Sequence, residues 1–223
     1  MKCIIFDCDG VLVDSEIITT KYFIKYLHDI GYQISIEDAI KRFTGISDKA
    51  VYEEISKESG ILFTSEQIKH IQEQVHYALH AELPAITGMT ELLASLEKNG
   101  TKMCVASSGT LDKIYRSLDV TGLKKYFSDQ NIFSVQNVQK GKPAPDLFLF
   151  AAMKMGYDAK DCIVIEDSLA GIEAALAANM RIIGFLGGSH AHYDWYKLKM
   201  SAYNIPIAHN SIELSKILTE RTL

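Results

Sequence analysis

The sequence has few prolines, no block of basic residues and no long apolar run. With 4 prolines in 223 residues, 48% apolar residues and no repeat or low-complexity tract, its composition is that of an ordered globular protein. The net charge of −5 comes from 23 basic and 28 acidic residues and gives no electrostatic footprint for duplex DNA or an anionic membrane. No run of 18 apolar residues could form a membrane-spanning helix. Nucleic acid and membrane partners are therefore not expected.

The first residues and the four cysteines bear on the cellular compartment. Acidic residues follow the run Cys3–Phe6 directly and leave no room for a basic region and a signal-type apolar segment, so we expect a cytoplasmic protein. Cys3, Cys104 and Cys162 lie in or beside short apolar runs, which favours free structural thiols over disulfides. Cys8 lies between two aspartates, and no nearby residue supports a catalytic role for its thiol.

Short apolar runs alternate with helical patterns along most of the chain. The expected strands are Cys3–Phe6, Met103–Ala106, Cys162–Ile165 and Arg181–Phe185, and the expected helices are Thr87–Asn99, Leu111–Leu118, Pro145–Met155 and Leu169–Ala178. Alternating strands and helices indicate parallel strands joined by right-handed crossovers. Strands that are apolar throughout are covered on both faces. The pattern predicts an α/β protein with a Rossmann-like, doubly wound parallel sheet.

A stretch of roughly 70 residues, the size of a small subdomain, interrupts this alternation. It has no convincing strand and three helical patterns, at Ile17–Ile30, Ala50–Ile55 and Ile68–Leu79. We therefore expect a core formed by residues 1–14 and 86–223 and an inserted helical subdomain formed by residues 15–85. Both ends of the insertion fall beside the C-terminal end of the first strand, where doubly wound sheets bind ligands. The insertion is accordingly expected to act as a lid.

The segment FDCDGVLVDSE places Asp7 and Asp9 at the end of the first expected strand, before a flexible Gly10. Carboxylates at positions i and i+2 of an extended chain point the same way, and two like charges together cost free energy unless a cation or a proton is shared. A nucleophile and a general acid/base working with a divalent metal would explain the pair. The alternative is that both are turn residues before a glycine, which is common at strand ends.

Three further segments carry polar residues at strand ends or helix starts. In VASSGT, Ser107 and Ser108 suit an anion site, and the alternative is ordinary helix capping by Ser108 or Thr110. In KGKPAPD, Lys142 precedes two prolines and a helix, where a plain surface lysine is also common. In IVIEDSLAGIEAA, Glu166 and Asp167 follow an apolar strand. Acids often complement a helix N-terminus, yet two adjacent acids here also suit coordination of a hard cation.

All four segments are expected at one edge of the sheet, because the strands that carry them are parallel. In order and spacing, hhhDxDGxxxDS, hhhSSG, GKPxPD and hhxEDSxxG resemble the four motifs of the haloacid dehalogenase (HAD) superfamily of phosphohydrolases. The inserted helices resemble its C1-type cap, in the subgroup with β-phosphoglucomutase and sugar-phosphate phosphatases such as 6-phosphogluconate phosphatase. The resemblance covers nearly the whole chain. It implies a Mg²⁺-dependent phosphatase that acts on a small metabolite, namely a sugar, sugar-acid or polyol phosphate.

The resemblance also implies roles for the motif residues. Asp7 would attack phosphorus and form an aspartyl-phosphate, while Asp9 would protonate the leaving group and later deprotonate the attacking water. Mg²⁺ would be held by the side chains of Asp7 and Asp167 and by the backbone carbonyl of Asp9. Glu166 would help to hold it, directly or through water. The side chains that would bind the phosphoryl oxygens are Ser107, Ser108 and Lys142.

The subdomain is expected to choose the leaving group. Its segment KRFTGIS resembles the substrate loop of C1 caps and offers four candidate residues, Arg42, Thr44, Gly45 and Ser47. Arg42 could pair with a carboxylate or hydroxyls of a sugar acid or sugar phosphate, or it could simply end a solvated helix. Members that resemble β-phosphoglucomutase carry a histidine early in the first cap helix, where this sequence has Thr19. Hydrolysis is therefore favoured over mutase activity.

Three other functions remain as alternatives: a sugar phosphomutase, a catalytically silent phosphometabolite-binding or regulatory module, and a dehalogenase. The intact motif residues argue against a silent module, and a general acid at Asp9 serves an alkoxide rather than a halide. His190 and His192 lie in a glycine-rich polar segment without a third ligand, so we expect exposed loop residues without a role. We expect a monomer, with a weak dimer as the alternative.

Overall fold

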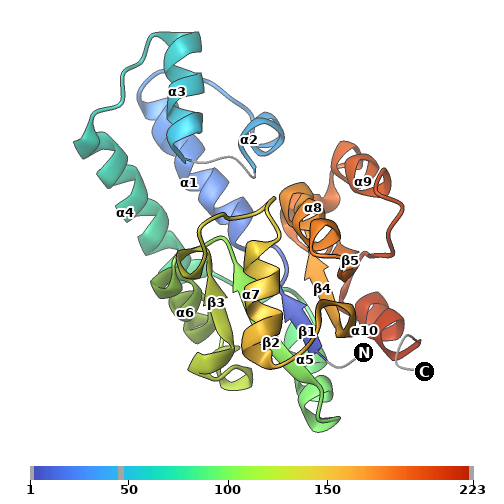
Figure 1. Ribbon diagram of the computed structural model, residues 1–223. Helices are drawn as coiled ribbons and strands as arrows, with labels where there is room; N and C mark the ends of the chain where they lie inside the picture. The colour runs from blue at the N-terminus through green and yellow to red at the C-terminus, as the bar shows by residue number, and fades with distance from the viewer. Residues whose placement is uncertain (1–2, 45–47, 221–223) are drawn as a thin grey trace. The chain divides into compact units, whose positions relative to one another are not determined.

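The computed structural model describes residues 3–44 and 48–220. One parallel sheet has the strand order β3-β2-β1-β4-β5-β6 (Figure 1). Its strands are β1 (Cys3–Phe6), β2 (Lys102–Ser107), β3 (Ile132–Ser134), β4 (Cys162–Glu166), β5 (Arg181–Phe185) and β6 (Ile207–Ala208). The predicted α/β fold with a doubly wound parallel sheet is confirmed.

The central strands are apolar because both of their faces are covered. Every residue of β1 and β4 is buried, and in β2 only Lys102 at the start is exposed. Four of the six strands match the predicted runs within two residues. The edge strands β3 and β6, which have three and two residues, were not predicted. Strands this short produce no readable hydrophobic pattern.

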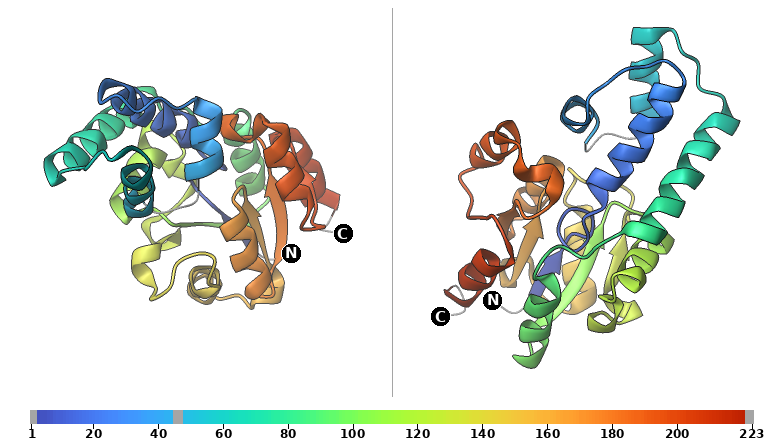
Figure 2. Two further views of the ribbon diagram at one scale, coloured as in Figure 1. Left: turned by 90° about the horizontal axis from the view of Figure 1, so that it is seen from above. Right: turned by 180° about the vertical axis from the view of Figure 1, so that it is seen from behind.

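Helices cover both faces of the sheet. They are α5 (Met89–Lys98), α6 (Leu111–Val120), α7 (Asp146–Met155), α8 (Leu169–Ala177), α9 (Asp194–Ser201) and α10 (Ser211–Glu220). On one face, α7 packs against β1, β2 and β3, and α8 packs against β4 and β5. The view from behind in Figure 2 shows α5 on the opposite face, where it packs against α10. Right-handed crossovers running in both directions from β1 place helices on both sides.

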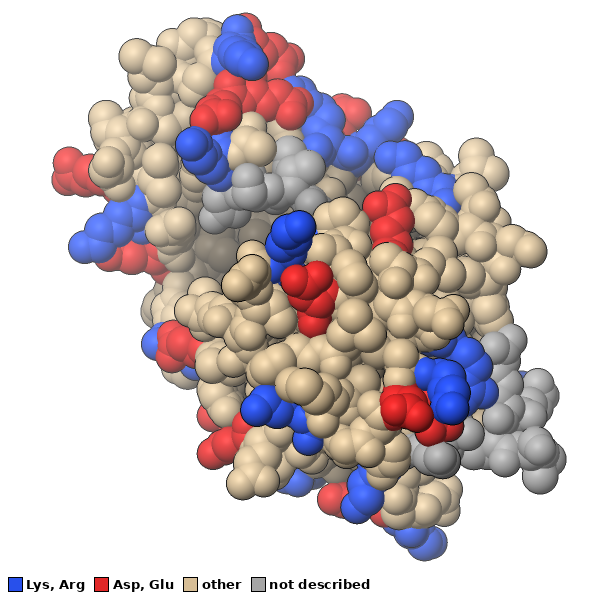
Figure 3. All heavy atoms as spheres, in the orientation of Figure 1, with Lys and Arg blue, Asp and Glu red and all other residues tan. Residues whose placement is uncertain are grey.

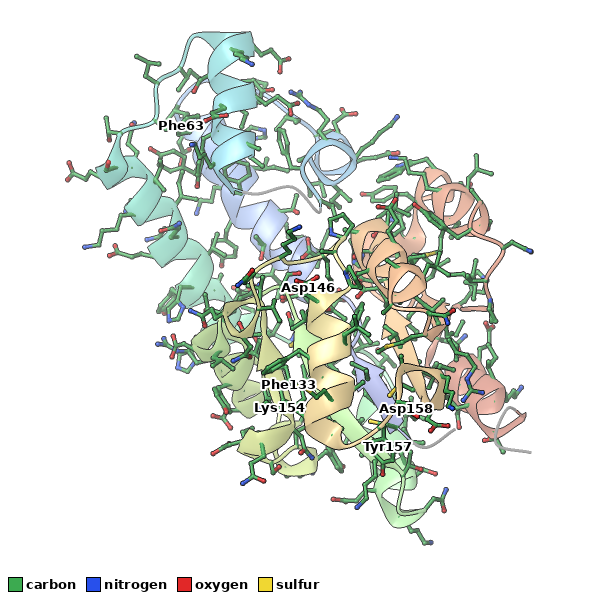
Figure 4. All side chains as sticks on the ribbon, in the orientation of Figure 1. Phe63, Phe133, Asp146, Lys154, Tyr157 and Asp158 are labelled. Carbon is green, nitrogen blue, oxygen red and sulfur yellow. The ribbon has the colours of Figure 1, made fainter. Side chains whose placement is uncertain are left out.

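Helix α7 illustrates how these elements are held. Asp146 begins the helix and Lys154 lies in its last turn, so each charge complements the helix dipole (Figure 4). Phe133 of β3 packs edge-on against Phe150 of α7, with ring centroids 5.7 Å apart. Gly156 ends the helix in a left-handed conformation. The helix thereby fixes the loop that precedes it, which carries Lys142.

The chain divides into two compact units, one formed by Met1–Asp14 with Pro84–Leu223 and the other by Ser15–Leu83. The second unit contains the helices α1 (Ser15–Asp29), α2 (Ile36–Phe43), α3 (Asp48–Ser59) and α4 (Ser65–Glu82). Helix α2, whose eight residues are capped by Ser35, was not predicted. Thr64 and Gln67 form a capping box at the start of α4.

The helical unit has a small aromatic core of its own. Leu27, Tyr32, Val51 and Ile55 are buried in it. Phe63 packs on Tyr52 with ring centroids 4.8 Å apart, and Figure 4 labels Phe63 at the edge of this core. The unit therefore buries its own apolar surface, as a separate subdomain requires.

Charged side chains of both signs are interspersed on the face drawn in Figure 3, as expected from 23 basic and 28 acidic residues. Within the described ranges, no helix has both the length and the apolar character needed to cross a membrane.

Candidate active site

Three buried carboxylates gather where the sheet changes direction. Phe6 of β1 is level with Ile165 of β4, so Asp7 and the pair Glu166–Asp167 emerge side by side. The chain runs from β1 toward β2 but from β4 toward β5, which makes the gap between β1 and β4 the switch point where doubly wound sheets bind ligands. The three residues are 6%, 1% and 4% exposed, and ligand oxygens from all three lie within 4.8 Å of one another.

Lys142 is brought into this cluster by the loop before α7. Its Nζ lies 2.5 Å from Asp7 Oδ1 and 2.8 Å from Glu166 Oε2, and its side chain is 4% exposed. The ammonium also lies 4.8 Å from the centroid of the Phe148 ring. Burial favours the neutral amine, but the carboxylates of Asp7 and Glu166 outweigh it and hold the pKa of Lys142 above its usual value. The alternative of a plain surface lysine is wrong.

The charge balance of the cluster favours a cation. Burial raises the pKa of Asp7 well above its usual value; Lys142 opposes this shift, while Glu166 and Asp167 add to it. Three ionised carboxylates and one ammonium leave a net charge of −2 in a buried space. Clustered carboxylate oxygens are ligands that Mg²⁺ and Ca²⁺ prefer. The residues present therefore fit a divalent cation, and Asp7, Glu166 and Asp167 are the group that could hold it.

Glu166 is fixed by three donors. Its Oε1 accepts hydrogen bonds from the Ser168 backbone N–H at 3.1 Å and from the Ser168 hydroxyl at 2.8 Å, while Oε2 faces Lys142. Ser168 in turn caps α8 by accepting from the N–H of Gly171 at 3.0 Å. A carboxylate has about four lone-pair positions, so Glu166 has one left.

Asp9 lies in a loop and not in the extended chain that the sequence suggested. The backbone bends after Asp7, and Gly10 has a φ of +78° and donates its N–H to the carbonyl of Val13 at 2.8 Å. The orientation of Asp9 is set by Lys113, whose Nζ donates to Asp9 Oδ2 at 2.9 Å. The two aspartates are therefore held by two different lysines. Lys113, in the first turn of α6, was not predicted as a site residue.

Ser107 ends β2 beside this site and is 1% exposed. Its Oγ accepts the N–H of Gly109 at 3.1 Å and keeps its own proton to donate. The carbonyl of Gly109 accepts from the Ser134 hydroxyl at 2.6 Å, which fixes the turn. Ser108 is exposed, and Thr110, not Ser108, caps α6 by accepting from the Lys113 N–H. Ser107 and the helix start are thus arranged as an anion site would be.

The expectation that His190 is an exposed loop residue is wrong. His190 is fully buried, and its Nε2 lies 2.9 Å from Asp167 Oδ2. His192, two residues later, is exposed as expected. Nothing local in a Gly-Gly-Ser-His segment predicts burial, because the partner comes from another strand.

The predicted substrate residues of the helical unit fall into two groups. Gly45 and Ser47 lie outside the described residues, whereas Arg42 lies near the end of α2 and Thr44 caps it. Arg42 donates to Glu54 at 2.8 Å and to Glu58 at 2.5 Å. It also lines a pocket of about 510 Å³ within the helical unit. An anion that reached Arg42 would compete with both carboxylates.

The cysteines are free and buried, as predicted. Cys8, beside the acidic cluster, is also buried. Burial raises the pKa of its thiol well above the usual value, and the charges of Asp9 and Asp7 add to this. A thiol held neutral is a poor nucleophile, which agrees with the absence of a sequence partner for Cys8.

An α/β sheet that brings a buried carboxylate, a buried lysine and an acidic pair able to hold a cation to its switch point is the arrangement of a phosphohydrolase. Comparison with known proteins gives the family: residues 4–185 match the haloacid dehalogenase-like hydrolase family. The chain belongs to this family, and the predicted family and hydrolase class are confirmed.

Similar proteins include enzymes with named activities. The chain is 31% identical to 6-phosphogluconate phosphatase of Escherichia coli over 85% of each chain. It is 32% identical to β-phosphoglucomutase of Bacillus subtilis over 82% of this chain and 83% of that one. Among solved structures, a haloacid dehalogenase-like protein from Agrobacterium tumefaciens superposes with a TM-score of 0.89 at 31% identity over 100% of both chains. A HAD family hydrolase from Deinococcus radiodurans with bound phosphate and sodium has a TM-score of 0.85 at 27% identity, over 99% and 96% of the chains.

Proposed function

We propose that this protein is a Mg²⁺-dependent phosphatase that releases inorganic phosphate from a small phosphorylated metabolite through a phosphorylated Asp7. One observation carries the proposal: a buried carboxylate, Asp7, lies 2.5 Å from the ammonium of Lys142 and beside two further acids at the sheet's switch point. Structural needs alone do not account for three clustered buried carboxylates and one buried lysine, because each buried charge costs on the order of several kcal/mol unless it is fully compensated. Phosphoryl transfer depends mainly on positioning and electrostatic stabilisation, which such a set can supply.

The cation would be held by Asp7, by Asp167 and by the backbone carbonyl of Asp9. When bound, Mg²⁺ supplies positive charge that offsets the charge on the phosphoryl oxygens and on the carboxylates. Glu166 has three donors on its two oxygens already. We therefore assign Glu166 to the orientation of Lys142 and to contact with the cation through water.

Lys142 solves an electrostatic problem for the nucleophile. A carboxylate ~4 Å from one phosphate charge is repelled by about 4 kcal/mol at an effective dielectric constant near 20, and a phosphate monoester carries nearly two charges. Lys142 is buried at the nucleophile itself, so its charge acts where solvent screens it little. Ser107 adds a hydroxyl donor at the end of the neighbouring strand for a phosphoryl oxygen.

The reaction proceeds in two displacements. In the first, a carboxylate oxygen of Asp7 forms a bond to phosphorus while the bond from phosphorus to the leaving oxygen breaks, and protonated Asp9 gives its proton to that oxygen. In the second, Asp9 takes a proton from water, the water oxygen bonds to phosphorus, and the bond to Asp7 breaks. The products are inorganic phosphate, the free Asp7 carboxylate and protonated Asp9. Lys113 holds Asp9 in place for both proton transfers.

The relatives support a proposal for the substrate class. A 6-phosphogluconate phosphatase and a hexitol phosphatase of Escherichia coli both align over at least 82% of this chain. We propose a sugar, sugar-acid or polyol phosphate, chosen by the helical unit formed by residues 15–83. The pocket beside Arg42 offers that unit polar groups for hydroxyls, among them Tyr32, Ser35 and Glu58.

A sugar phosphomutase is the second candidate, and the 32% identity to β-phosphoglucomutase supports it. Thr19 in α1 stands where members of that type carry a histidine. Incubation with a hexose 1-phosphate distinguishes the two functions. Free phosphate without a bisphosphate intermediate supports the phosphatase, and a hexose 6-phosphate product supports the mutase.

The deciding experiment is Asp7→Asn, assayed with p-nitrophenyl phosphate and Mg²⁺. We expect phosphate release to fall to background, because an amide does not attack phosphorus, while circular dichroism stays unchanged. Undiminished turnover would falsify the proposed function. Wild-type protein that binds a phosphorylated metabolite but releases no phosphate would instead indicate a regulatory binding module.

A further inference from the structure

Asp167 is contacted by a buried histidine that the proposed reaction does not use. His190 belongs to the loop after β5, within a short helical turn at Ser189–His192. Its ring is fully buried, with Nε2 2.9 Å from Asp167 Oδ2. Burying a polar ring costs free energy unless it is paired, so its position beside one carboxylate needs a reason. Of its two ring nitrogens, Nε2 is the one that faces this carboxylate.

A second group from the same segment contacts the other end of Asp167. The hydroxyl of Tyr196, in α9, donates to the backbone carbonyl of Asp167 at 3.1 Å. The rings of His190 and Tyr196 pack edge to face, with centroids 5.2 Å apart and planes at 89°. The side chain and the main chain of one acidic residue are therefore both held from one stretch of seven residues.

This segment is itself anchored to the loop that carries the nucleophile. Ser189 donates its N–H to Asp14 Oδ1 at 3.0 Å, and its hydroxyl donates to the other oxygen of Asp14. At Gly10 the backbone passes so close that an added Cβ would lie 1.9 Å from Asp167 Oδ2 and 2.8 Å from His190 Cε1. The loops after β1 and β5 thus enclose Asp167 between them.

We propose that His190 and Tyr196 are positioning residues that hold Asp167 in the orientation that binds the divalent cation. The inference rests on the proposed function, in which Asp167 is a cation ligand. The close contact of His190 Nε2 with Oδ2 restrains the plane of the carboxylate, and the Tyr196 hydroxyl fixes the backbone from which that carboxylate extends. Partners of this kind commonly change metal affinity by about 10- to 100-fold.

The test is a calorimetric titration of the full chain with Mg²⁺. We expect His190→Phe, which keeps a ring but has no N–H donor, to weaken Mg²⁺ binding by about 10- to 100-fold. His190→Gln places an amide N–H near the position of Nε2 and should restore most of the affinity. Tyr196→Phe loses one neutral hydrogen bond and should weaken binding by about twofold to tenfold.

Matched controls separate positioning from folding. His209→Gln changes an exposed histidine, and Tyr203→Phe removes a hydroxyl that donates to Glu173. Both should leave the Mg²⁺ affinity unchanged. In His190→Phe and Tyr196→Phe, the Mg²⁺ concentration for half-maximal activity should rise, and in His190→Gln it should return most of the way to the wild-type value. KM for p-nitrophenyl phosphate at saturating Mg²⁺ should stay within about twofold in all three. A merely structural role would lower Tm without moving the Mg²⁺ affinity.

The outcomes distinguish this inference from the proposed function. Wild-type protein that neither binds Mg²⁺ nor releases phosphate contradicts both. Wild-type protein that binds Mg²⁺, with unchanged affinity in His190→Phe or Tyr196→Phe, overturns the positioning role alone. If His190→Phe is not folded by circular dichroism, Tyr196→Phe decides: an unchanged Mg²⁺ affinity refutes the inference, and a reduced one at unchanged fold supports it.

Discussion

Replacing Asp7 with asparagine is expected to raise stability in the absence of metal while it removes activity. The side chain is 6% exposed and shares its space with Glu166 and Asp167, whose oxygens lie within 4.8 Å, and with Lys142 at 2.5 Å. Asparagine keeps the shape of the side chain and the oxygen that accepts from Lys142. It removes one buried negative charge.

The magnitude follows from these separations. At an effective dielectric constant of about 20, each repulsion within 4.8 Å is at least about 3.5 kcal/mol and the attraction at 2.5 Å is about 7 kcal/mol. The two repulsions together offset the attraction, so the desolvation cost of the Asp7 carboxylate remains. Neutral replacements for buried ionic groups often stabilise by about 1–4 kcal/mol. With about 2 kcal/mol and a shift of about 2–4 °C per kcal/mol, Tm should rise by about 4–8 °C.

The measurement is thermal unfolding in EDTA at neutral pH, with the exposed Asp119→Asn as the matched control. Mg²⁺ should stabilise the wild type more than Asp7→Asn, since a ligand stabilises the state that binds it. A Tm for Asp7→Asn below that of the control in EDTA would show that the Asp7 charge stabilises the fold, and the reasoning would be wrong.

The same residue predicts how stability depends on pH. Because burial holds the pKa of Asp7 above its usual value of 3.8, the folded protein keeps a proton that the unfolded chain has released. The metal-free wild type should therefore lose stability as the pH rises from about 4 through the folded pKa. Asp7→Asn should lack this component. Equal slopes of Tm against pH in EDTA for the two proteins would contradict the shift.

Three further substitutions test other parts of the site. Gly10→Ala should abolish Mg²⁺-dependent activity, because the new Cβ would lie 1.9 Å from Asp167 Oδ2. The control Gly100→Ala, at φ +68° with nothing within 4 Å of the new Cβ, should keep its activity and lose only about 1–2 kcal/mol of folding stability to backbone strain. Equal activity in the two variants would contradict this packing. Asp9→Ala should release a burst of nitrophenol equal to the enzyme concentration and then turn over slowly, because the aspartyl-phosphate forms but the attacking water is not deprotonated. Steady turnover without protein-bound phosphate would argue against this role of Asp9. Ser168→Ala should lower the free energy of unfolding by about 1 kcal/mol, because α8 loses its cap, and should also reduce activation by Mg²⁺, because Glu166 loses a donor. The control Thr64→Ala removes the cap of α4 and should lower stability by a similar amount without affecting activation by Mg²⁺.

Much of the fold could be predicted because its central strands are uniformly apolar. The strands β1, β4 and β5 follow directly from runs such as Cys162–Ile165, where burial on both faces requires apolar residues. The edge strand β6 could not be predicted, since two residues after Pro206 are paired only by their neighbour β5. Its existence is a property of the sheet and not of the local sequence.

The residues of the candidate site also differ in how far the sequence predicts them. Asp7, Lys142 and Asp167 could be found because each follows a strand or precedes a helix, and parallel strands bring such positions together. The roles of His190 and Lys113 were missed because their contacts, with Asp167 and Asp9, join segments that no periodicity relates. Both look like solvated residues until the loops after β1 and β5 are in place.

The pairing of β1 with β4 has a practical consequence. The ladder continues one residue past β1, where Asp7 donates its N–H to the carbonyl of Ile165 at 3.0 Å. A shift of this strand by a single position would turn every side chain to the opposite face and present Cys8 in place of the aspartate. Enzymatic turnover thus reports strand alignment, and recovered specific activity after refolding would measure the fraction of molecules paired in the correct register.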